Sequence, residues 1–147
     1  MYRVTSEESM TDKAPGITAD ESEIRQIFEQ WSQAVRNKNL GAILAHHHSD
    51  FLMFDVPPPF LSRGIPAYVE TWNLFFSMAP IPVKFDFDQL EIHASADVAF
   101  LTAIGHCRDT EPNGQIAPLD FRLTMGLRKI DGQWIIVHEH HSVPAAS

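Results

Sequence analysis

The C-terminal part of the chain alternates between apolar and polar residues, and this pattern constrains the fold more than any other feature. In "LDFRLTMGLRKI" every second residue from Leu119 to Leu127 is apolar, which is the two-residue period of a β-strand with one buried face. Asp131-Gly132 follows, a dipeptide typical of the turn in a β-hairpin, and "QWIIVHEHHS" continues as a last strand. We therefore expect residues 119–143 to form a hairpin with one face in the core.

Two more strands are predicted before this hairpin. The residues of "DVAFLTAIGHCRD" include few polar ones, which favours a central strand, and "EPNGQ" after it is a turn sequence. Upstream, Val83 and Phe87 belong to an alternating segment, whereas Leu90 and Ile92 continue it out of phase, which indicates a β-bulge. The second half of the chain thus predicts four antiparallel strands.

The first half has helical periodicity instead. "TADE" has the form of a capping box, in which Thr18 caps a helix and Glu21 reaches back, and apolar residues recur at helical spacing as far as Val35. A shorter helix is expected over residues 40–47. The polar segment 1–17 is expected to be a disordered lead-in, so that one domain covers residues 18–147.

A short strand at residues 51–56 and a third helix complete the first half. The helix corresponds to "RGIPAYVETWNLFFSMAP", with Pro66 in its first turn and Pro80 beyond its end. Helices that precede an antiparallel run predict an α+β fold, with three N-terminal helices packed on one face of a curved, mainly antiparallel sheet.

Composition narrows the function classes. A chain of 147 residues with a net charge of −8 and no basic run is unsuited to a nucleic-acid partner. No apolar stretch has the length of a membrane span, and one cysteine, Cys107, cannot form an internal disulfide. These features predict a cytoplasmic protein with no membrane partner.

Two segments, "FDVPPPFLSRGIPAYVETW" and "DGQWIIVHEHHSVP", together with the element order, resemble the nuclear transport factor two-like superfamily. The nearest subgroup is the SnoaL-like, ketosteroid-isomerase-related proteins, and the resemblance covers roughly residues 20–144. It implies a cone-shaped α+β barrel with a pocket, and a homodimer formed through the outer face of the sheet. The same fold hosts both enzymes and assembly domains.

The resemblance to ketosteroid isomerase places Asp55 at the position of the catalytic base. A cap on the turn that begins at Pro57 is an equally good explanation for this aspartate. The residues that donate hydrogen bonds to the enolate oxygen in ketosteroid isomerase do not carry over. The position of the donor tyrosine falls on Trp31, and that of the donor carboxylic acid falls near Thr124 or Met125. Tyr68 could donate a hydrogen bond instead. A steroid isomerase is therefore disfavoured, and the predicted catalytic residues are Asp55 and His141.

The roles of the C-terminal histidines depend on the hairpin register. A two-residue turn pairs Thr124 with Glu139, whereas a three-residue loop with Gly132 as its bulge residue pairs Thr124 with His138. We favour the bulged loop, because it places the apolar residues of both strands on one face. Glu139 and His141 then face the pocket, together with Ile135 and Val137. The opposite, dimer-forming face then carries Trp134, Ile136, His138 and His140.

The remaining pocket residues follow from the same resemblances. Association domains of calcium/calmodulin-dependent kinases have arginines that line their pocket. The resemblance places Thr102, Met125 and His141 at these positions, so this chain lacks the anion-binding cluster. The predicted ligand is thus largely neutral. The expected pocket residues are Trp31, Tyr68, Trp72, Thr102, Met125 and Glu139.

Metal binding is the alternative for the histidines. His138 and His140 form a His-x-His pair, which together with a carboxylate is a ligand set for zinc or iron. The run from His46 to His48 has no spacing typical of metal ligands, so no metal and no cofactor are predicted.

The sequence predicts a domain that binds a small apolar or neutral molecule. If it is an enzyme, the chemistry is proton transfer next to a carbonyl, of the isomerase, cyclase or dehydratase type. Asp55 is then the base, with His141, Glu139 or Tyr68 polarising the oxygen. A non-catalytic ligand-binding or dimerisation module is the alternative, and the sequence leaves the choice open.

Overall fold

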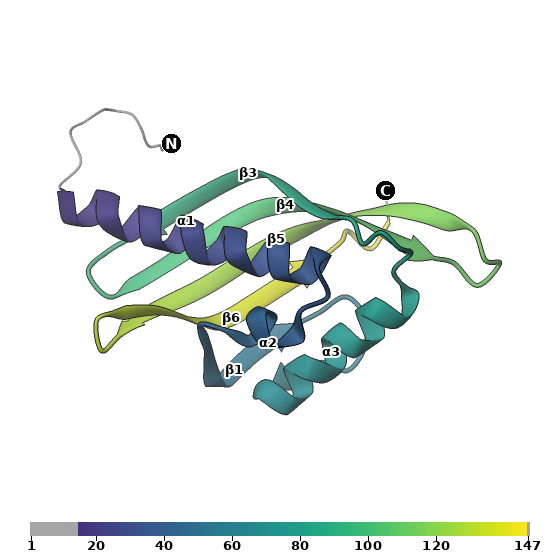
Figure 1. The fold of residues 1–147 in the computed structure, drawn as a ribbon, viewed down its shortest axis with the longest axis horizontal. Helices are drawn as coiled ribbons and strands as arrows, with labels where there is room; N and C mark the ends of the chain where they lie inside the picture. The colour runs from purple at the N-terminus through teal and green to yellow at the C-terminus, as the bar shows by residue number, and fades with distance from the viewer. Residues whose placement is uncertain (1–14, 147) are drawn as a thin grey trace.

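Three helices and six strands follow one another along residues 15–146, the part of the chain that this computed structural model describes (Figure 1). In chain order the elements are α1 (Pro15–Arg36), α2 (Leu40–Leu44), β1 (His47–Phe54), β2 (Ser62–Arg63), α3 (Ile65–Met78), β3 (Phe85–Ala94), β4 (Val98–Thr110), β5 (Ile116–Ile130) and β6 (Gln133–Ser142).

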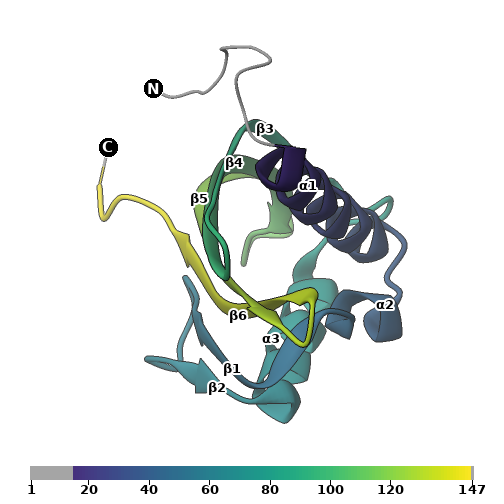
Figure 2. The same cartoon turned by 90° about the vertical axis from the view of Figure 1, so that its left-hand side faces the viewer.

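The six strands form one sheet in the order β2-β1-β6-β5-β4-β3. All neighbours are antiparallel except β1 and β6, which are parallel. The sheet bends strongly but does not close, and Figure 2 shows α1 on the concave side of β3, β4 and β5. Helix α3 packs under β1 and β2. The architecture is therefore α+β with an open, curved sheet.

Most predicted elements are present, with shifted boundaries. Strands β4 and β5 are neighbours, and helix α3 has Pro66 in its first turn, both as expected. Helix α1 begins at Pro15, so the backbone of Thr18 lies inside the helix rather than at its start. Helix α2 is shorter than predicted. Most of the predicted lead-in, residues 1–14, lies outside the described residues.

Strand β1 begins at His47, four residues before the predicted start at Phe51. The polar residues "HHSD" give no local signal for a strand, but His47 pairs with Ile136 of β6. The reversal into the strand occurs at His46, which has a positive φ of 62°. Pairing with a distant strand therefore decides the local structure here.

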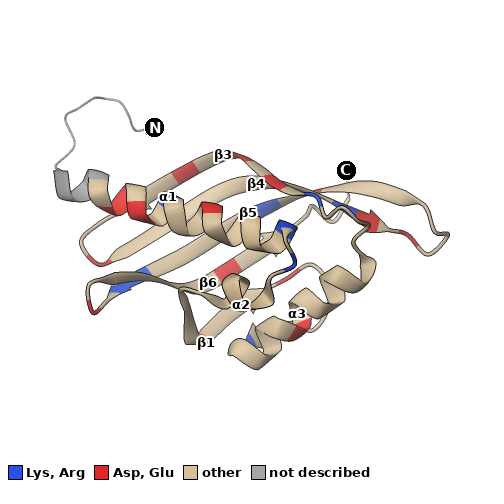
Figure 3. Cartoon of the chain, viewed as in Figure 1, with Lys and Arg blue, Asp and Glu red and all other residues tan. Residues whose placement is uncertain are grey.

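The predicted bulge in β3 is confirmed. Asp88 pairs with Ile104 and Glu91 with Thr102, so that two residues of β3 lie opposite one residue of β4, and Gln89 has a positive φ of 56°. Strand β3 is one edge of the sheet. Its exposed acidic residues, red in Figure 3, discourage pairing with another chain at this edge.

The favoured register of the last hairpin is wrong. Asp131 and Gly132 form a two-residue turn with positive φ angles, and Ile130 pairs with Gln133. An unpredicted bulge then occurs at Val137 in β6, so that Thr124 pairs with His140.

The bulge in β6 reverses which side chains face the core. Before it, Trp134 and Ile136 point inward and are fully buried, contrary to the expectation that they lie on the outer face. After it, Glu139 and His141 point inward, as expected. Their predicted direction is correct, although the register that led to it is not.

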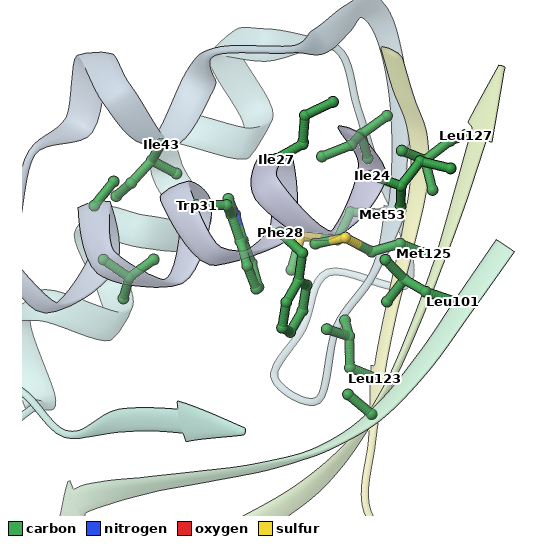
Figure 4. Packing of buried hydrophobic residues seen from close by; sticks show 14 of the residues in the cluster. Ile24, Ile27, Phe28, Trp31, Ile43, Met53, Leu101, Leu123, Met125 and Leu127 are labelled. Atoms are coloured by element: carbon green, nitrogen blue, oxygen red, sulfur yellow. The ribbon is translucent and has the colours of Figure 1, made fainter. Parts of the chain in front are cut away.

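The core lies between α1 and the concave face of the sheet (Figure 4). One face of α1 contributes Ile24, Ile27, Phe28 and Trp31, which have the three- and four-residue spacing of a helix stripe. These side chains pack against Leu101, Leu123, Met125 and Leu127 of β4 and β5. Burial of this apolar surface drives the helix onto the sheet.

A glycine in the middle of the sheet gives room to an aromatic ring. Gly105 of β4 pairs with Phe121 of β5, and a Cβ atom at Gly105 would overlap the Phe121 ring. The ring can therefore lie across the neighbouring strand. There Phe121 stacks on His141, with the ring centroids 5.4 Å apart and the planes 11° from parallel.

We predict that Gly105→Ala destabilises the protein by about 1–3 kcal/mol, because the Phe121 ring must move out of a packed core. Gly126→Ala is the matched control, since the nearest atom to its added Cβ is 3.6 Å away. Urea unfolding of the two variants measures the effect. Equal stability of both would contradict this account of Gly105.

Candidate functional site

A cavity of about 220 Å³ lies between α3, the end of β1, and the inner faces of β3 to β6. Its wall is mostly apolar and includes Met53, Trp72, Phe75, Phe85, Leu119 and Phe121. The polar side chains in the wall are those of Asp55, Thr71, Arg108, Asp109 and His141. A few polar groups in an apolar concavity are typical of sites for small molecules.

Asp55 lies directly after β1 and is half-buried. Its Oδ1 accepts a hydrogen bond of 2.8 Å from the backbone N–H of Val56, and its side chain also lines the cavity. The two explanations from the sequence, a turn cap and a pocket carboxylate, are thus compatible in one residue.

Glu139 lies behind this cavity and is fully buried. The Tyr68 hydroxyl donates to its Oε2 at 2.8 Å. His47 Nε2 lies 2.7 Å from Oε2, and His141 Nε2 lies 3.1 Å from Oε1. Both carboxylate oxygens therefore have hydrogen-bond partners, as a buried charge requires.

The electrostatics of Glu139 follow from these partners. Burial alone would raise the pKa of the Glu139 carboxyl, but hydrogen bonds from His141 and His47, together with attraction to the positive charge on His47, outweigh burial and lower its pKa to about 2. The Glu139 side chain is thus a buried carboxylate at neutral pH.

Tyr68 connects this carboxylate to α1. Its hydroxyl accepts a hydrogen bond of 2.9 Å from Trp31 Nε1 and donates to Glu139. Burial, followed by the negative charge of Glu139, raises the pKa of the Tyr68 phenol well above its ordinary value. The hydroxyl therefore keeps its proton and remains a donor.

His141 joins the buried carboxylate to the cavity. Its side chain is 8% exposed and stacks on the Phe121 ring. The Trp31 ring lies perpendicular to it, with the ring centroids 6.4 Å apart. Nε2 bonds to Glu139, while Nδ1 makes no hydrogen bond within residues 15–146. A ring held at one nitrogen and open at the other is suited to exchanging a proton with a ligand.

Two other buried donors belong to the cavity wall. Trp72 Nε1 and Arg108 Nε are buried and have no hydrogen-bond partner among the described residues. The Trp72 N–H lies near enough to the Tyr68 hydroxyl to favour the phenolate, but it makes no hydrogen bond of good geometry with it. Unpaired buried donors are rare in folded proteins, and both of these N–H groups are covered by other protein atoms.

Cys107 also lines the cavity, but it is not suited to act as a nucleophile. Burial, followed by the negative charge of Asp109, raises the pKa of its thiol to about 11. The reactive thiolate form is therefore scarce at neutral pH.

The structure separates the predicted site residues into three groups. Asp55, Trp72 and His141 line the cavity together. Trp31, Tyr68 and Glu139 form the layer behind His141. The other two residues do not line it: Met125 lies in the core, and Thr102 pairs with Thr124 on the outer face, between the inward-facing Leu101 and Ala103.

His47 is the main residue that the sequence analysis missed. The sequence places His47 at the end of the helix expected over residues 40–47, among three adjacent histidines, whereas its partner Glu139 lies 92 positions away. Its side chain is fully buried. No local pattern indicates this contact. Within residues 15–146, no group of three or more His, Cys, Asp or Glu side chains is arranged to hold a metal ion.

His138 and His140 lie on the outer face of the sheet. His138 Nδ1 donates to the carbonyl of Leu52 at 2.8 Å, and the Phe54 ring contacts both imidazoles. These contacts connect β6 to β1 on the side opposite the cavity.

We predict that Glu139→Gln lowers the free energy of unfolding by about 3 kcal/mol at neutral pH, because it removes a buried carboxylate from its donors. The carboxyl has an ordinary pKa of 4.5 and a folded pKa of about 2. The stabilisation is therefore present above pH ~4.5 and is lost as the pH falls towards 2.

Thermal unfolding of wild type and variant between pH 2 and 7 checks this expectation. The two curves should converge as the pH approaches ~2. Glu70→Gln, an exposed change on α3, is the control and should follow wild type at every pH. A constant difference between Glu139→Gln and wild type across this range would contradict the assigned charge.

Comparison with solved structures supports this fold. A protein of unknown function from Pseudomonas putida KT2440, described as NTF2-like, is 36% identical, with a TM-score of 0.76 over 86% of this chain and 88% of that chain. A ketosteroid isomerase-like protein from Erwinia carotovora atroseptica SCRI1043 is 19% identical, with a TM-score of 0.69 over 84% and 96%.

An NTF2-like superfamily protein from Salmonella enterica serovar Typhimurium LT2 is 18% identical, with a TM-score of 0.74 over 88% of this chain and 94% of that chain. No curated protein matches the chain significantly. None of the helices in residues 15–146 has both the length and the apolar character needed to cross a membrane. The model of the SnoaL-like domain matches residues 24–146, and the chain therefore belongs to the SnoaL-like domain family.

Proposed function

We propose that this protein binds a small, largely neutral carbonyl compound and catalyses a proton transfer next to the carbonyl, of the isomerase, cyclase or dehydratase type. The observation that carries the proposal is the arrangement of His141 in the cavity wall. One ring nitrogen is held by a buried carboxylate, and the other has no protein partner in the described chain.

His141 and Asp55 are the two proton-transfer groups of this proposal. The resemblance to ketosteroid isomerase assigns the base to Asp55, with His141 polarising the oxygen. The hydrogen bonds favour His141 as the base, because Nε2–H donates to Glu139 and leaves the Nδ1 lone pair for the substrate. Asp55 then exchanges a proton with the second reacting atom of the substrate.

The proposed step is enolisation. His141 Nδ1 removes a proton from the carbon next to the carbonyl, and the electron pair moves to the carbonyl oxygen. Glu139 stabilises the imidazolium that forms, as a buried carboxylate does in other histidine-dependent sites. The unpaired N–H groups of Trp72 and Arg108 are the candidate donors to the enolate oxygen. Delivery of a proton to a different carbon completes an isomerisation. Transfer of the His141 proton to a hydroxyl on the neighbouring carbon, which then leaves as water, completes a dehydration.

The aromatic wall supports an apolar ligand. Trp72, Phe75 and Phe85 pack edge to face around the cavity. The lining residues include one cation, Arg108, and two carboxylates, Asp55 and Asp109. This balance favours a neutral oxygen acceptor over a strongly anionic ligand.

We predict that His141→Gln and Asp55→Asn each slow proton exchange by about 10²–10⁴-fold while ligand binding is kept. Deuterium incorporation from solvent into a panel of enolisable ketones and hydroxy-ketones measures the rate, and ligand-induced shifts in melting temperature measure binding. Asp50→Asn, an exposed carboxylate outside the cavity, is the control.

The same panel separates catalysis from binding alone. If wild type exchanges no proton in any compound and Asp55→Asn only raises the melting temperature, the enzyme proposal fails. The domain is then a non-catalytic ligand-binding or dimerisation module.

We also propose that the protein is a homodimer through the outer face of the sheet. Trp134 and Ile136 cannot contribute, because they are buried within one chain. Instead, Phe100, which is 48% exposed, lies beside Gly126 and His138 in one row across β4, β5 and β6. Its half-exposed ring, which stacks on His93, offers an apolar contact for a second copy. The cytoplasmic location stays a prediction.

We predict that Phe100→Asp converts the dimer to a monomer, because a charge in the interface would lose its water. Ile81→Asp is the control, since Ile81 is 81% exposed in the loop before β3. Sedimentation equilibrium at micromolar concentration measures the mass. A monomeric wild type would contradict the proposal.

A further inference from the structure

His47 is buried in an unusual position for a histidine. It is the first residue of β1, and its ring packs between Phe51 and Tyr68, with centroid distances of 4.9 and 4.7 Å. Its side chain has no exposed surface, and neither has that of Glu139, with which it pairs. The protonation of this pair therefore depends on a few fixed neighbours rather than on water.

The neighbours of His47 determine where its protons are. Nδ1 lies 2.9 Å from the carbonyl oxygen of Ala45, which only accepts hydrogen bonds, so Nδ1 must carry a proton. Nε2 lies 2.7 Å from Glu139 Oε2. Either Nε2 carries a second proton and Glu139 is a carboxylate, or Nε2 is bare and Glu139 keeps the proton.

The other contacts of Glu139 decide between these two states. Trp31 donates to the Tyr68 hydroxyl, so the hydroxyl proton is directed at Glu139 Oε2. Oε1 faces His141 Nε2. A carboxyl group surrounded by donors at both oxygens is stabilised in its ionised form. His47 is therefore doubly protonated and carries the compensating positive charge.

The same balance determines the state of His141. Glu139 is one negative charge, and His47 neutralises it, so a second buried imidazolium would leave an uncompensated charge. Nδ1 of His141 also has no acceptor within the described chain. The lowest-cost arrangement keeps His141 neutral, with its single proton on Nε2.

We propose that His47 is a positioning residue that holds the proton neutralising Glu139 and thereby keeps His141 neutral, with the Nδ1 lone pair exposed to the cavity. The catalytic meaning of this arrangement rests on the proposed function, whereas the charge assignment does not. His47 acts through Glu139 and does not line the cavity.

Other titratable groups face His141 from the cavity. Asp55 comes from the end of β1, and Cys107, Arg108 and Asp109 come from β4. Trp31 of α1 and Phe121 of β5 cover the ring without charge. Tyr68 of α3 reaches it only through Glu139. Because the cavity groups include both signs, the buried partner Glu139 dominates the charge balance at His141.

Histidine ¹⁵N NMR at pH 7 tests the charge assignment without any substrate. In wild type we expect two protonated nitrogens on His47, and one protonated Nε2 with a bare Nδ1 on His141. His47→Gln keeps a donor near Glu139 but removes the charge. In this variant His141 should take up the second proton at pH 7. His140→Gln, an exposed change next to His141 on β6, is the control. It should leave the ¹⁵N signals of His47 and His141 unchanged.

Glu139→Gln tests the same charge assignment by removing the carboxylate instead of the histidine. This variant replaces His47→Gln if the latter does not fold. Without the carboxylate, His47 should lose its second proton and keep the one on Nδ1. A singly protonated His47 in wild type, or a His141 that stays neutral in His47→Gln, would overturn the proposal.

The pH profile of proton exchange connects the assignment to catalysis. His47→Gln should exchange protons at least ten-fold more slowly than wild type at pH 7, and the rate should recover as the pH rises and His141 loses its second proton. A role in packing alone would lower the rate equally at every pH. If the NMR result is as expected but wild type shows no exchange, the charge assignment stands and the proposed function fails.

Discussion

The buried carboxylate of Glu139 is the interaction on which the site depends. A carboxylate without water is costly unless donors surround it, and here they come from three separate elements: His47 from β1, Tyr68 from α3 and His141 from β6 itself. Trp31 adds α1 through its bond to Tyr68. The helices and the sheet must therefore pack in one way before this charge is satisfied, which joins the geometry of the cavity wall to the stability of the fold.

The bulge at Val137 makes this arrangement compatible with a well-packed hairpin. It lets Trp134 and Ile136 fill the core near the turn, and it then lets Glu139 and His141 face the same side further along. A regular strand would send one of these pairs to the outer face. Bulges commonly redirect side chains next to functional sites, and this one places two polar residues where the apolar core ends.

The cavity and the buried layer have different properties. The cavity wall is rich in aromatic rings, and two of its residues, Trp72 and Arg108, carry a buried N–H without a partner in residues 15–146. In the layer behind it, the hydrogen bonds of Trp31, Tyr68 and His47 Nε2 lead to Glu139. His141 belongs to both, since one nitrogen is in the layer and the other faces the cavity. A charged group held by several hydrogen bonds behind the proton-transfer residue is the property that the proposed enolisation needs.

The sequence by itself determined the α+β class, the third helix, the strands of the second half and the bulge in β3, because these depend on local periodicity and turn residues. Asp55, Trp72 and His141, which the sequence grouped as site residues, line one cavity, but His141 faces it because of a bulge that the sequence did not predict. Only the tertiary structure decided the start of β1, the register of β6 and the burial of His47. These follow from the parallel pairing of β1 with β6 and from the charge of Glu139, which join residues far apart in the chain and leave no periodic signal.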